Sequence, residues 1–591
     1  MKGKLVGMAF IAAVCVFSAA RAGQYSVKIV SSAQPDCWSL EEMVKEVIAG
    51  KDSDREKALA LHNFGMAHQI HFIGPMEGDD YLDDALKLLG VYGYNLCGNN
   101  STAMCALYNL AGLEARRRFL KGHVVPEVRF EGRWNYIDTD MYGYVVKPGD
   151  LAIASVDDLI ENPGLFARGR LNPDPFFPFD KMEAMQRSVT GAGGLKDYHP
   201  YSNAHLMRLQ LREHESVTCY YRPRGRFYLS PAIVPHKMST MYRKYWIDGP
   251  VRTNTLAWTD TVPASYGNAV FEYEPDLRSR TFSLENPQIE GVRVQGGDEL
   301  PPLVSAVKGK KASVVIEVAS PWVIAGLQND ITDFEDNSDG AVISGWFWRM
   351  EEEDENRILV SLDGGRSWEK VWENTHLGAV PFHVDVTALV QGRYGYLVKF
   401  EWTGNGGTGQ MGLEGLRLTT WAELSPMALP RLETGLNKMS ITTSSHRAFL
   451  SESRWHQGLS LWNEERENLT ENDNEKHPRL YPLDPQTPGV LIFSPGAEGI
   501  LDELRISITA YALKDGNPGD VQVALSMSEN KGSTWTGLEK FTVHPEHGQD
   551  WMNFNHVVTG RSLDGNRTRI RIEVTGGGLD KVTANSLVRV V

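Results

Sequence analysis

Three residues able to do nucleophilic chemistry follow one another in a short stretch of the chain: Cys97, His123 and Asp138. A thiolate can attack a carbonyl carbon, and a histidine can take up and return its proton. A carboxylate can hold the imidazole in the correct tautomer and stabilise its charged form. Asp140 is a second carboxylate close by, which we expect to be a polar residue flanking a hairpin rather than the catalytic acid. These residue types predict acyl-transfer chemistry.

The residues after Cys97 carry a helical pattern. Met104, Leu107 and Tyr108 recur at helical spacing, and Gly112 stands where a glycine commonly ends a helix. Cys97 is therefore predicted to stand at a helix start. Unpaired amides and the positive end of the helix dipole at such a start favour a thiolate and so a more reactive sulfur.

A β-hairpin is predicted to carry the histidine and the carboxylate. Glu131 and Gly132 are typical of a two-residue turn between two extended stretches. The register of that hairpin places His123 opposite Asp140, with Asp138 one pair away on the same face. His123 could meet either carboxylate, and a bulge would decide between them.

Residues 94–140 resemble the transglutaminase-like superfamily, which includes transglutaminases, peptide N-glycanases and many bacterial cysteine proteases. The resemblance implies an α+β, papain-like N-terminal domain in which Cys97 is the nucleophile, His123 the general base and Asp138 the residue that orients it. Residues 54–72 resemble the family's first helix more loosely. The matching positions are Cys97, Ala103, Cys105, Gly112 to Arg116, His123, Glu127-Val128, Gly132, Trp134 and Asp138.

The resemblance implies acyl transfer from an amide in a peptide, a glycopeptide or an amide-bearing glycan, with no cofactor and no metal. Water as acceptor would give hydrolysis and an amine would give cross-linking, and we expect hydrolysis because a secreted chain with sandwich domains resembles a degradative enzyme. Two alternatives remain open. One is a polysaccharide lyase or other glycan-active enzyme on the same fold, and the other is a non-catalytic protein that binds glycan or a protein partner. The lyase would use a tyrosine as acid and a histidine as base, from Tyr198, His199, Tyr201 and His205.

The composition and the first residues of the chain limit which class of protein this can be. The chain has 591 residues and a formal net charge of −15, which argues against nucleic acid as a partner. Residues 1–22 combine Lys2 and Lys4 with an apolar run and a small-residue cleavage site, as a secretory signal peptide does. We therefore predict a secreted or periplasmic protein, and no later apolar run is long enough to span a membrane.

The remaining cysteines and histidines are expected to be structural. Cys105 is predicted to lie in the helix core, and Cys37 and Cys219 could form a disulfide in an oxidising compartment. No ligand set for zinc is recognised. Three histidines near one another are expected to be surface and cap residues: His62, His68 and His71.

The pattern along the chain predicts three domains after the signal peptide. Helices over 39–48 and 54–70 and a polar, acidic link over 77–84 belong to an α+β domain, 23–250. From about Thr253 short strands separated by turn residues predict all-β sandwiches, over 251–428 and 429–591. Each sandwich contains a turn that resembles the Asp-box, at 361–368 and 528–535, and we expect both turns to be structural.

Overall fold

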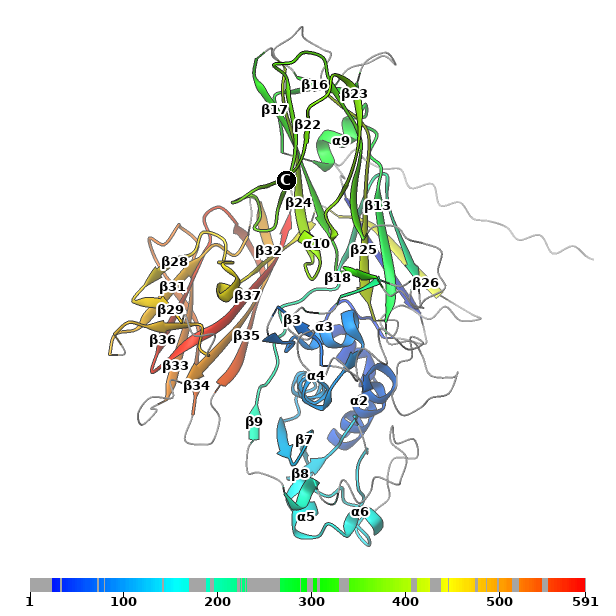
Figure 1. Cartoon of the computed structure of the whole chain (residues 1–591). Helices are drawn as coiled ribbons and strands as arrows, with labels where there is room; N and C mark the ends of the chain where they lie inside the picture. Colours follow the sequence, from blue (N-terminus) through cyan, green and yellow to red (C-terminus); the bar gives the residue numbers. More distant parts are fainter. Residues whose placement is uncertain are drawn as a thin grey trace, which may run out of the picture.

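The computed structural model contains a helical part and two β-sandwiches (Figure 1). Residues 1–22, the predicted signal peptide, lie outside the residues that it describes. The described residues are 24–31, 35–71, 74–78, 80–140, 143–168, 186, 188–191, 196–220, 224, 226–228, 230, 266–286, 288–294, 301–305, 309–328, 340–404, 412–425, 437–444, 446–472, 477–484, 486–496, 499–512, 520–544 and 551–589.

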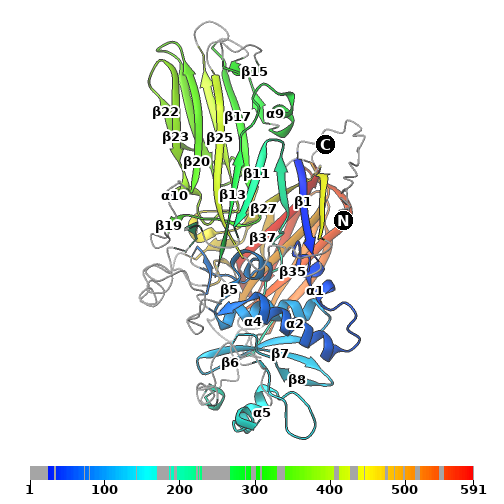
Figure 2. The ribbon, with the colours of Figure 1, turned by 90° about the vertical axis from the view of Figure 1, so that its right-hand side faces the viewer.

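The helical part places helices over an antiparallel sheet of order β8-β7-β6-β9 (Figure 2). Ser39 and Ser53 cap the first two helices, which confirms the two helices predicted here. The elements are α1 (Leu40–Val47), α2 (Asp54–His68), α4 (Cys97–Leu110), β6 (Ala115–Leu120), β7 (His123–Phe130), β8 (Arg133–Tyr136), β9 (Lys196–Tyr198), α5 (Val156–Glu161) and α6 (Leu165–Arg168).

Helix α4 is the central element of this part. It begins at Cys97 as predicted, and Gly112 follows its end with a φ of +81°. Cys105 is fully buried, which confirms its predicted place in the core. Helix α2 approaches α4 closely because Gly65 has no side chain: a Cβ at that position would lie 2.5 Å from the Met104 sulfur.

The hairpin β7–β8 has the predicted turn but a shorter ladder. Glu131 and Gly132 adopt φ values of 53° and 75°, and Phe130 pairs with Arg133. The pairing ends at Tyr136, so the predicted continuation that placed His123 opposite Asp140 is wrong. The chain leaves the ladder because the Asp138 side chain accepts a hydrogen bond from the amide of Asp140 (2.8 Å), which forms a local turn instead.

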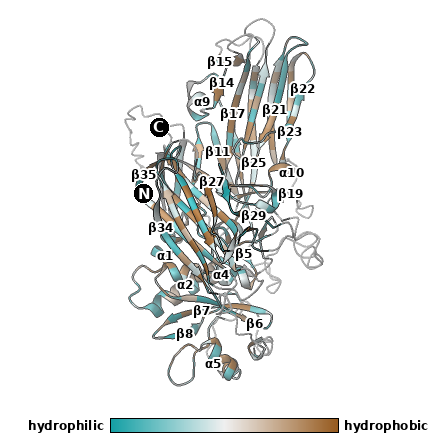
Figure 3. Ribbon diagram, turned by 90° about the vertical axis from the view of Figure 1, so that its left-hand side faces the viewer, coloured by the Kyte–Doolittle hydropathy of each residue, from teal (hydrophilic) through white to brown (hydrophobic). Residues whose placement is uncertain are grey.

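The first sandwich joins two sheets, which confirms an all-β sandwich in this part of the chain. In Figure 3 its strands alternate between hydrophobic and hydrophilic residues, as expected for sheets with one face in a core. One sheet contains β11 (Glu215–Tyr220), β13 (Gly267–Tyr273), β15 (Val292–Val294), β16 (Leu303–Ser305), β18 (Val323–Ile324), β20 (Ala341–Arg349), β23 (Gly378–Asp385) and β25 (Gly412–Leu424). The other contains β14 (Ile289–Glu290), β17 (Lys311–Ala319), β21 (Glu355–Ser361), β22 (Glu369–Asn374) and β24 (Gly395–Thr403).

The second sandwich repeats the first, except that β11 and β18 have no counterpart among its described strands. The sheet order β28-β31-β36-β33-β34 corresponds to β14-β17-β24-β21-β22, and β32 lies between β35 and β37 as β20 lies between β23 and β25. Its strands are β27 (His446–Glu452), β28 (Glu465–Glu467), β29 (Leu469–Glu471), β30 (Leu480–Pro482), β31 (Gly489–Phe493), β32 (Ile500–Ala512), β33 (Val521–Ser528), β34 (Thr536–Val543), β35 (Trp551–Asp564), β36 (Arg569–Thr575) and β37 (Gly577–Arg589). The two sandwiches are thus copies of one topology.

The Asp-box-like turns occupy equivalent hairpins, β21–β22 and β33–β34. In the first, Ser361 Oγ accepts from the amide of Gly365 (2.8 Å), and Asp363 Oδ1 accepts from the amide of Ser367 (2.9 Å). The second turn repeats both bonds at 2.8 and 2.9 Å, through Ser528 and Gly532 and through Asn530 and Thr534. These side chains cap their own turns, as expected for a structural motif.

Strands from distant parts of the sequence tie the three parts together. Strand β1 (Gln24–Ser31) lies between β10 (Leu209–Arg212) and β26 (Asn437–Ser444). Strand β11 belongs to the first sandwich through its pairing with β13, although it lies within the range predicted for the first domain. The helical part is therefore joined to the sandwiches by sheet hydrogen bonds as well as by the chain.

Candidate active site

Cys97 is half-buried at the first position of α4. Leu96 occupies the N-cap position and has no side-chain acceptor for the first-turn amides. Beside it, a Cβ built on Gly98 would have no atom of the described residues within 4 Å, so these residues leave space at the backbone next to the thiol. The local structure therefore combines a helix N-terminus with room for another group to approach.

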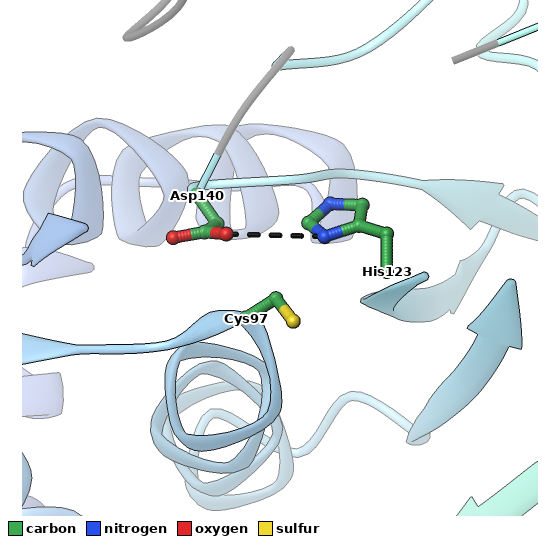
Figure 4. Close-up of side chains that lie close together, drawn as sticks. All are labelled: Cys97, His123 and Asp140. Carbon is green, nitrogen blue, oxygen red and sulfur yellow. Dashed lines mark ion pairs between the residues drawn. The ribbon is translucent and has the colours of Figure 1, made fainter. Parts of the chain in front are cut away.

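The His123 ring lies between two carboxylates, with Asp138 at hydrogen-bond distance from one ring nitrogen and Asp140 farther from the other. Its Nε2 lies 3.0 Å from Asp138 Oδ2, and its Nδ1 lies 3.9 Å from Asp140 Oδ2. The Cys97 sulfur, a His123 ring nitrogen and an Asp140 oxygen all lie within 4.8 Å of one another (Figure 4). The structure thus brings together Cys97, His123 and Asp138, and it adds Asp140.

Asp138 is fully buried and held from several directions. The Tyr136 hydroxyl donates to its Oδ2 (3.1 Å), the Asp140 amide donates to its Oδ1, and His62 Nε2 lies 3.2 Å from its backbone oxygen. These contacts fix the carboxylate that faces His123. A carboxylate held in this way can orient an imidazole.

The surroundings of His123 favour its charged form. Burial is the largest influence and by itself lowers the pKa of His123, but the charge and hydrogen bond of Asp138, followed by the hydrogen bond and charge of Cys97, outweigh it. The pKa of His123 therefore lies well above its ordinary value. An imidazolium held by the Asp138 carboxylate is the form that this balance favours.

His62 is a site residue that the sequence interpretation missed. It was expected at the surface, but its side chain is fully buried and touches the backbone of Asp138. Burial, outweighing the raising effects of Asn63 and Asp138, lowers the pKa of His62. The sequence spacing indicates this burial, because His62 lies four residues after Ala58 and three before Gly65, on the buried face of α2.

Side-chain hydrogen bonds attach the start of α4 to the sheet. Ser101 Oγ donates to the backbone oxygen of Val124 (2.9 Å), next to His123. Arg117 donates to Thr102 Oγ1 (2.9 Å) and pairs with Asp197 (2.6 Å). These contacts hold the helix that carries the thiol against the strand that carries the imidazole.

The residues considered for lyase chemistry contact other residues than Cys97, His123 and Asp138. The Tyr198 hydroxyl accepts from Arg116 (3.1 Å), His199 is exposed, and Tyr201 is buried near Asn109. His205 is buried, with its Nε2 2.8 Å from the backbone oxygen of Pro321 in the first sandwich. His205 therefore faces a different part of the molecule from Cys97.

The structure also bears on the disulfide that the sequence allows, on metal ligands and on membrane spans. Cys37 and Cys219, which could pair by sequence, form no disulfide among the described residues. The ligand types at Cys97, His123 and Asp140 are ones that Zn²⁺ accepts, and sequence reasoning recognised no such set. In the described part of the chain, no helix has the length and apolar character needed to cross a membrane.

Comparison with known proteins gives low similarities. No protein-family model matches the chain, and no curated protein matches it. The tandem CBM22-1-CBM22-2 domain of Xyn10C from Paenibacillus barcinonensis is 11% identical, over 51% of this chain and 92% of that one, with a TM-score of 0.19. The extracellular domain of ANXUR1 from Arabidopsis thaliana is 7% identical (50% and 87% covered, TM-score 0.16), and a putative secreted protein from Parabacteroides distasonis is 9% identical (63% and 99% covered, TM-score 0.13).

Proposed function

We propose that this protein is a secreted enzyme of the transglutaminase-like superfamily that hydrolyses an amide bond through Cys97, His123 and Asp138. The observation that carries the proposal is the position of the His123 imidazole, with Nε2 on Asp138 and Cys97 within reach of the ring. The helix start at Cys97, the hairpin at His123 and the order of the residues along the chain agree with the family's pattern. The substrate is a peptide, a glycopeptide or an amide-bearing glycan.

In the first half of the reaction, the Cys97 thiolate attacks the amide carbonyl carbon and the carbonyl oxygen takes the negative charge. The backbone amide of Cys97, at the uncapped start of α4, stabilises that oxyanion. The carbon–nitrogen bond then breaks, and the His123 imidazolium gives its proton to the leaving amine. A thioester on Cys97 and a neutral His123 remain.

In the second half, His123 takes a proton from water as the water oxygen attacks the thioester carbon. The carbon–sulfur bond breaks, the acid leaves, and the thiolate and imidazolium are restored. Asp138 stays ionised throughout and stabilises the imidazolium. An amine in place of water would give transfer, and we favour hydrolysis because a secreted chain with sandwich domains resembles a degradative enzyme.

The pH dependence of Cys97 alkylation by iodoacetamide tests the pair directly. Cys97 should reach its half-maximal rate below the pH of about 8.5 expected for a free cysteine. His123→Ala should move that midpoint upward. Peptide mass spectrometry separates the cysteines, and Cys105 is an internal control because burial raises its pKa to about 12.

Two outcomes of that experiment would contradict the proposal. One is a Cys97 as unreactive as Cys105 at neutral pH, and the other is a midpoint that His123→Ala leaves unchanged. If the pair is active, a screen of peptide and glycopeptide amides with and without added hydroxylamine would follow. Formation of a hydroxamate at the expense of the acid would identify the thioester intermediate.

A further inference from the structure

A cavity of about 220 Å³ lies where the two sandwiches meet the segment that follows β9. Its wall includes the end of β17, the first Asp-box-like turn and the start of β24 from one sandwich, and β27 from the other. His205 and Trp462 also line it, and none of the residues of the Cys97 site does. The cavity is therefore a separate site.

Three of the four arginines that line the cavity have partners in the protein. Arg454 pairs with Glu452 (3.1 Å), and Arg208 pairs with Glu503 (3.2 Å). Arg366 donates to the backbone oxygens of Ser460 and Leu461 (2.8 and 2.9 Å). The fold thus already uses hydrogen-bond donors of all three side chains, and it pairs the charges of Arg454 and Arg208.

The fourth arginine is Arg393, just before β24. Within the described part of the chain its guanidinium makes no ion pair and no hydrogen bond. Burial, followed by the neighbouring charge of Arg454, lowers the pKa of Arg393 to about 10 against the attraction of Glu452 and Glu77, so the group is still charged at neutral pH. Neither carboxylate forms an ion pair with it, so its donors are open to an anion, and a guanidinium binds a carboxylate in bidentate geometry.

His205 offers a hydrogen-bond acceptor in the same wall. Because the Pro321 oxygen can only accept, His205 Nε2 carries the proton in their 2.8 Å bond. Burial lowers the pKa of His205 to about 3, which keeps the ring neutral and leaves Nδ1 as an acceptor. That Nδ1 is buried and has no hydrogen-bond partner among the described residues. An unsatisfied buried acceptor costs free energy, which a hydroxyl donating to it would recover.

We propose that this cavity binds a sugar acid, with the sugar's carboxylate on Arg393 and one of its hydroxyls donating to His205 Nδ1. The volume is below the roughly 300–1,000 Å³ of sites for drug-sized ligands, which favours one sugar unit over an oligosaccharide. Trp462 lines the same space, and an aromatic residue in the wall suits the apolar side of a sugar ring. This inference does not depend on catalysis by Cys97.

Calorimetric titration of the mature full-length protein with D-glucuronate and D-galacturonate tests the proposal, with D-glucose as the uncharged comparison. At least one of the acids should bind and glucose should not. Arg393→Met should weaken binding about tenfold or more, as expected for loss of a charge-assisted hydrogen bond. His205→Leu should also weaken it because it removes Nδ1, and His205→Gln should recover part of the loss, because its amide can donate to Pro321 and its Oε1 can accept from a hydroxyl.

Two variants act as controls. Arg561→Gln removes an equal charge from an exposed position on β35 and should leave binding unchanged. Cys97→Ser should also leave binding unchanged, which separates this site from the proposed catalysis. Thermal melting should show that Arg393→Met is about as stable as the wild type, because the guanidinium makes no ion pair or hydrogen bond within the described residues.

The proposal is overturned if neither acid binds, or if Arg393→Met binds as well as the wild type. Binding of sulfate but of neither acid would overturn the assignment to a sugar. A large loss of stability in Arg393→Met would also overturn it, since it would mean that the guanidinium serves the fold. Binding of a uronate-terminated oligosaccharide and not of the free acid would support the proposal and identify a chain end as the ligand.

Discussion

His62 Nε2 lies 3.2 Å from the backbone carbonyl oxygen of Asp138. A carbonyl oxygen only accepts, so the proton must be on Nε2, and the lowered pKa of His62 keeps the ring neutral. The bond joins α2 to the turn that carries the catalytic carboxylate. His62 is therefore a positioning residue, because it acts through Asp138.

Replacing His62 separates this role from simple packing. His62→Phe removes the donor and should slow Cys97 alkylation and turnover about 10- to 100-fold, since small displacements of catalytic groups are costly. His62→Gln keeps a donor near the same place and should recover most of the rate. Equal rates in the two variants would show that the hydrogen bond has no positioning role.

The two carboxylates beside His123 should respond in opposite directions. Asp138→Asn removes the charge that stabilises the imidazolium and should lower kcat/KM about 100-fold or more. Asp140→Asn removes a negative charge near the sulfur, so a thiolate should form more readily and alkylation at about pH 6 should be faster. Alkylation rates of both variants check this, and a reversed order would assign the orienting role to Asp140.

The raised pKa of His123 predicts a pH-dependent stability. A group whose pKa is higher in the folded state stabilises the fold fully below its unfolded value of about 6.5, and this contribution is lost as the pH rises through the folded value. The difference in melting temperature between wild type and His123→Ala should therefore be largest near pH 6 and smaller near pH 9. Asp138→Asn should reduce this pH dependence, because it removes the main stabilising charge.

Buried charges couple the helical part to the second sandwich. Lys87, at the end of α3 (Ala85–Lys87), is buried and lies 2.7 Å from Glu77 and 3.9 Å from Glu452 of β27. Lys87→Met leaves both carboxylates without this cation and should lower the free energy of unfolding by about 3–5 kcal/mol. Urea denaturation measures the loss. Adding Glu77→Gln should restore part of it, and an additive double variant would show that the two residues are not coupled.

The parts of the site that could be predicted from the sequence depend on local signals. The helix start at Cys97 and the turn at Glu131 and Gly132 are each set by neighbouring residues, and both agree with the structure. The prediction that the strand pairing continues beyond Tyr136 was wrong. The Asp138 side chain accepts a hydrogen bond from the amide of Asp140, which competes with strand pairing.

The remaining differences arise from residues far apart in the sequence. The link over 77–84 was expected to be a polar connection, yet Glu77 and Asp84 are buried. One cation that neutralises Glu77, Arg454, comes from the second sandwich, and Asp84 accepts from the amides of Ala204 and His205. Local pattern cannot reveal such partners, and the same holds for the burial of His62 against the turn at Asp138.

The position of β1 between β10 and β26 has a consequence for how the chain is made. During synthesis β1 emerges from the ribosome before the other described strands, but the strand that covers one of its edges begins only at Asn437. Until then one row of its backbone amides and carbonyls has no strand partner, and an uncovered edge of this kind can pair with another chain. Pairing of this early strand on both edges therefore depends on the arrival of residues 437–444, so a chain that ends before them retains an edge prone to aggregation.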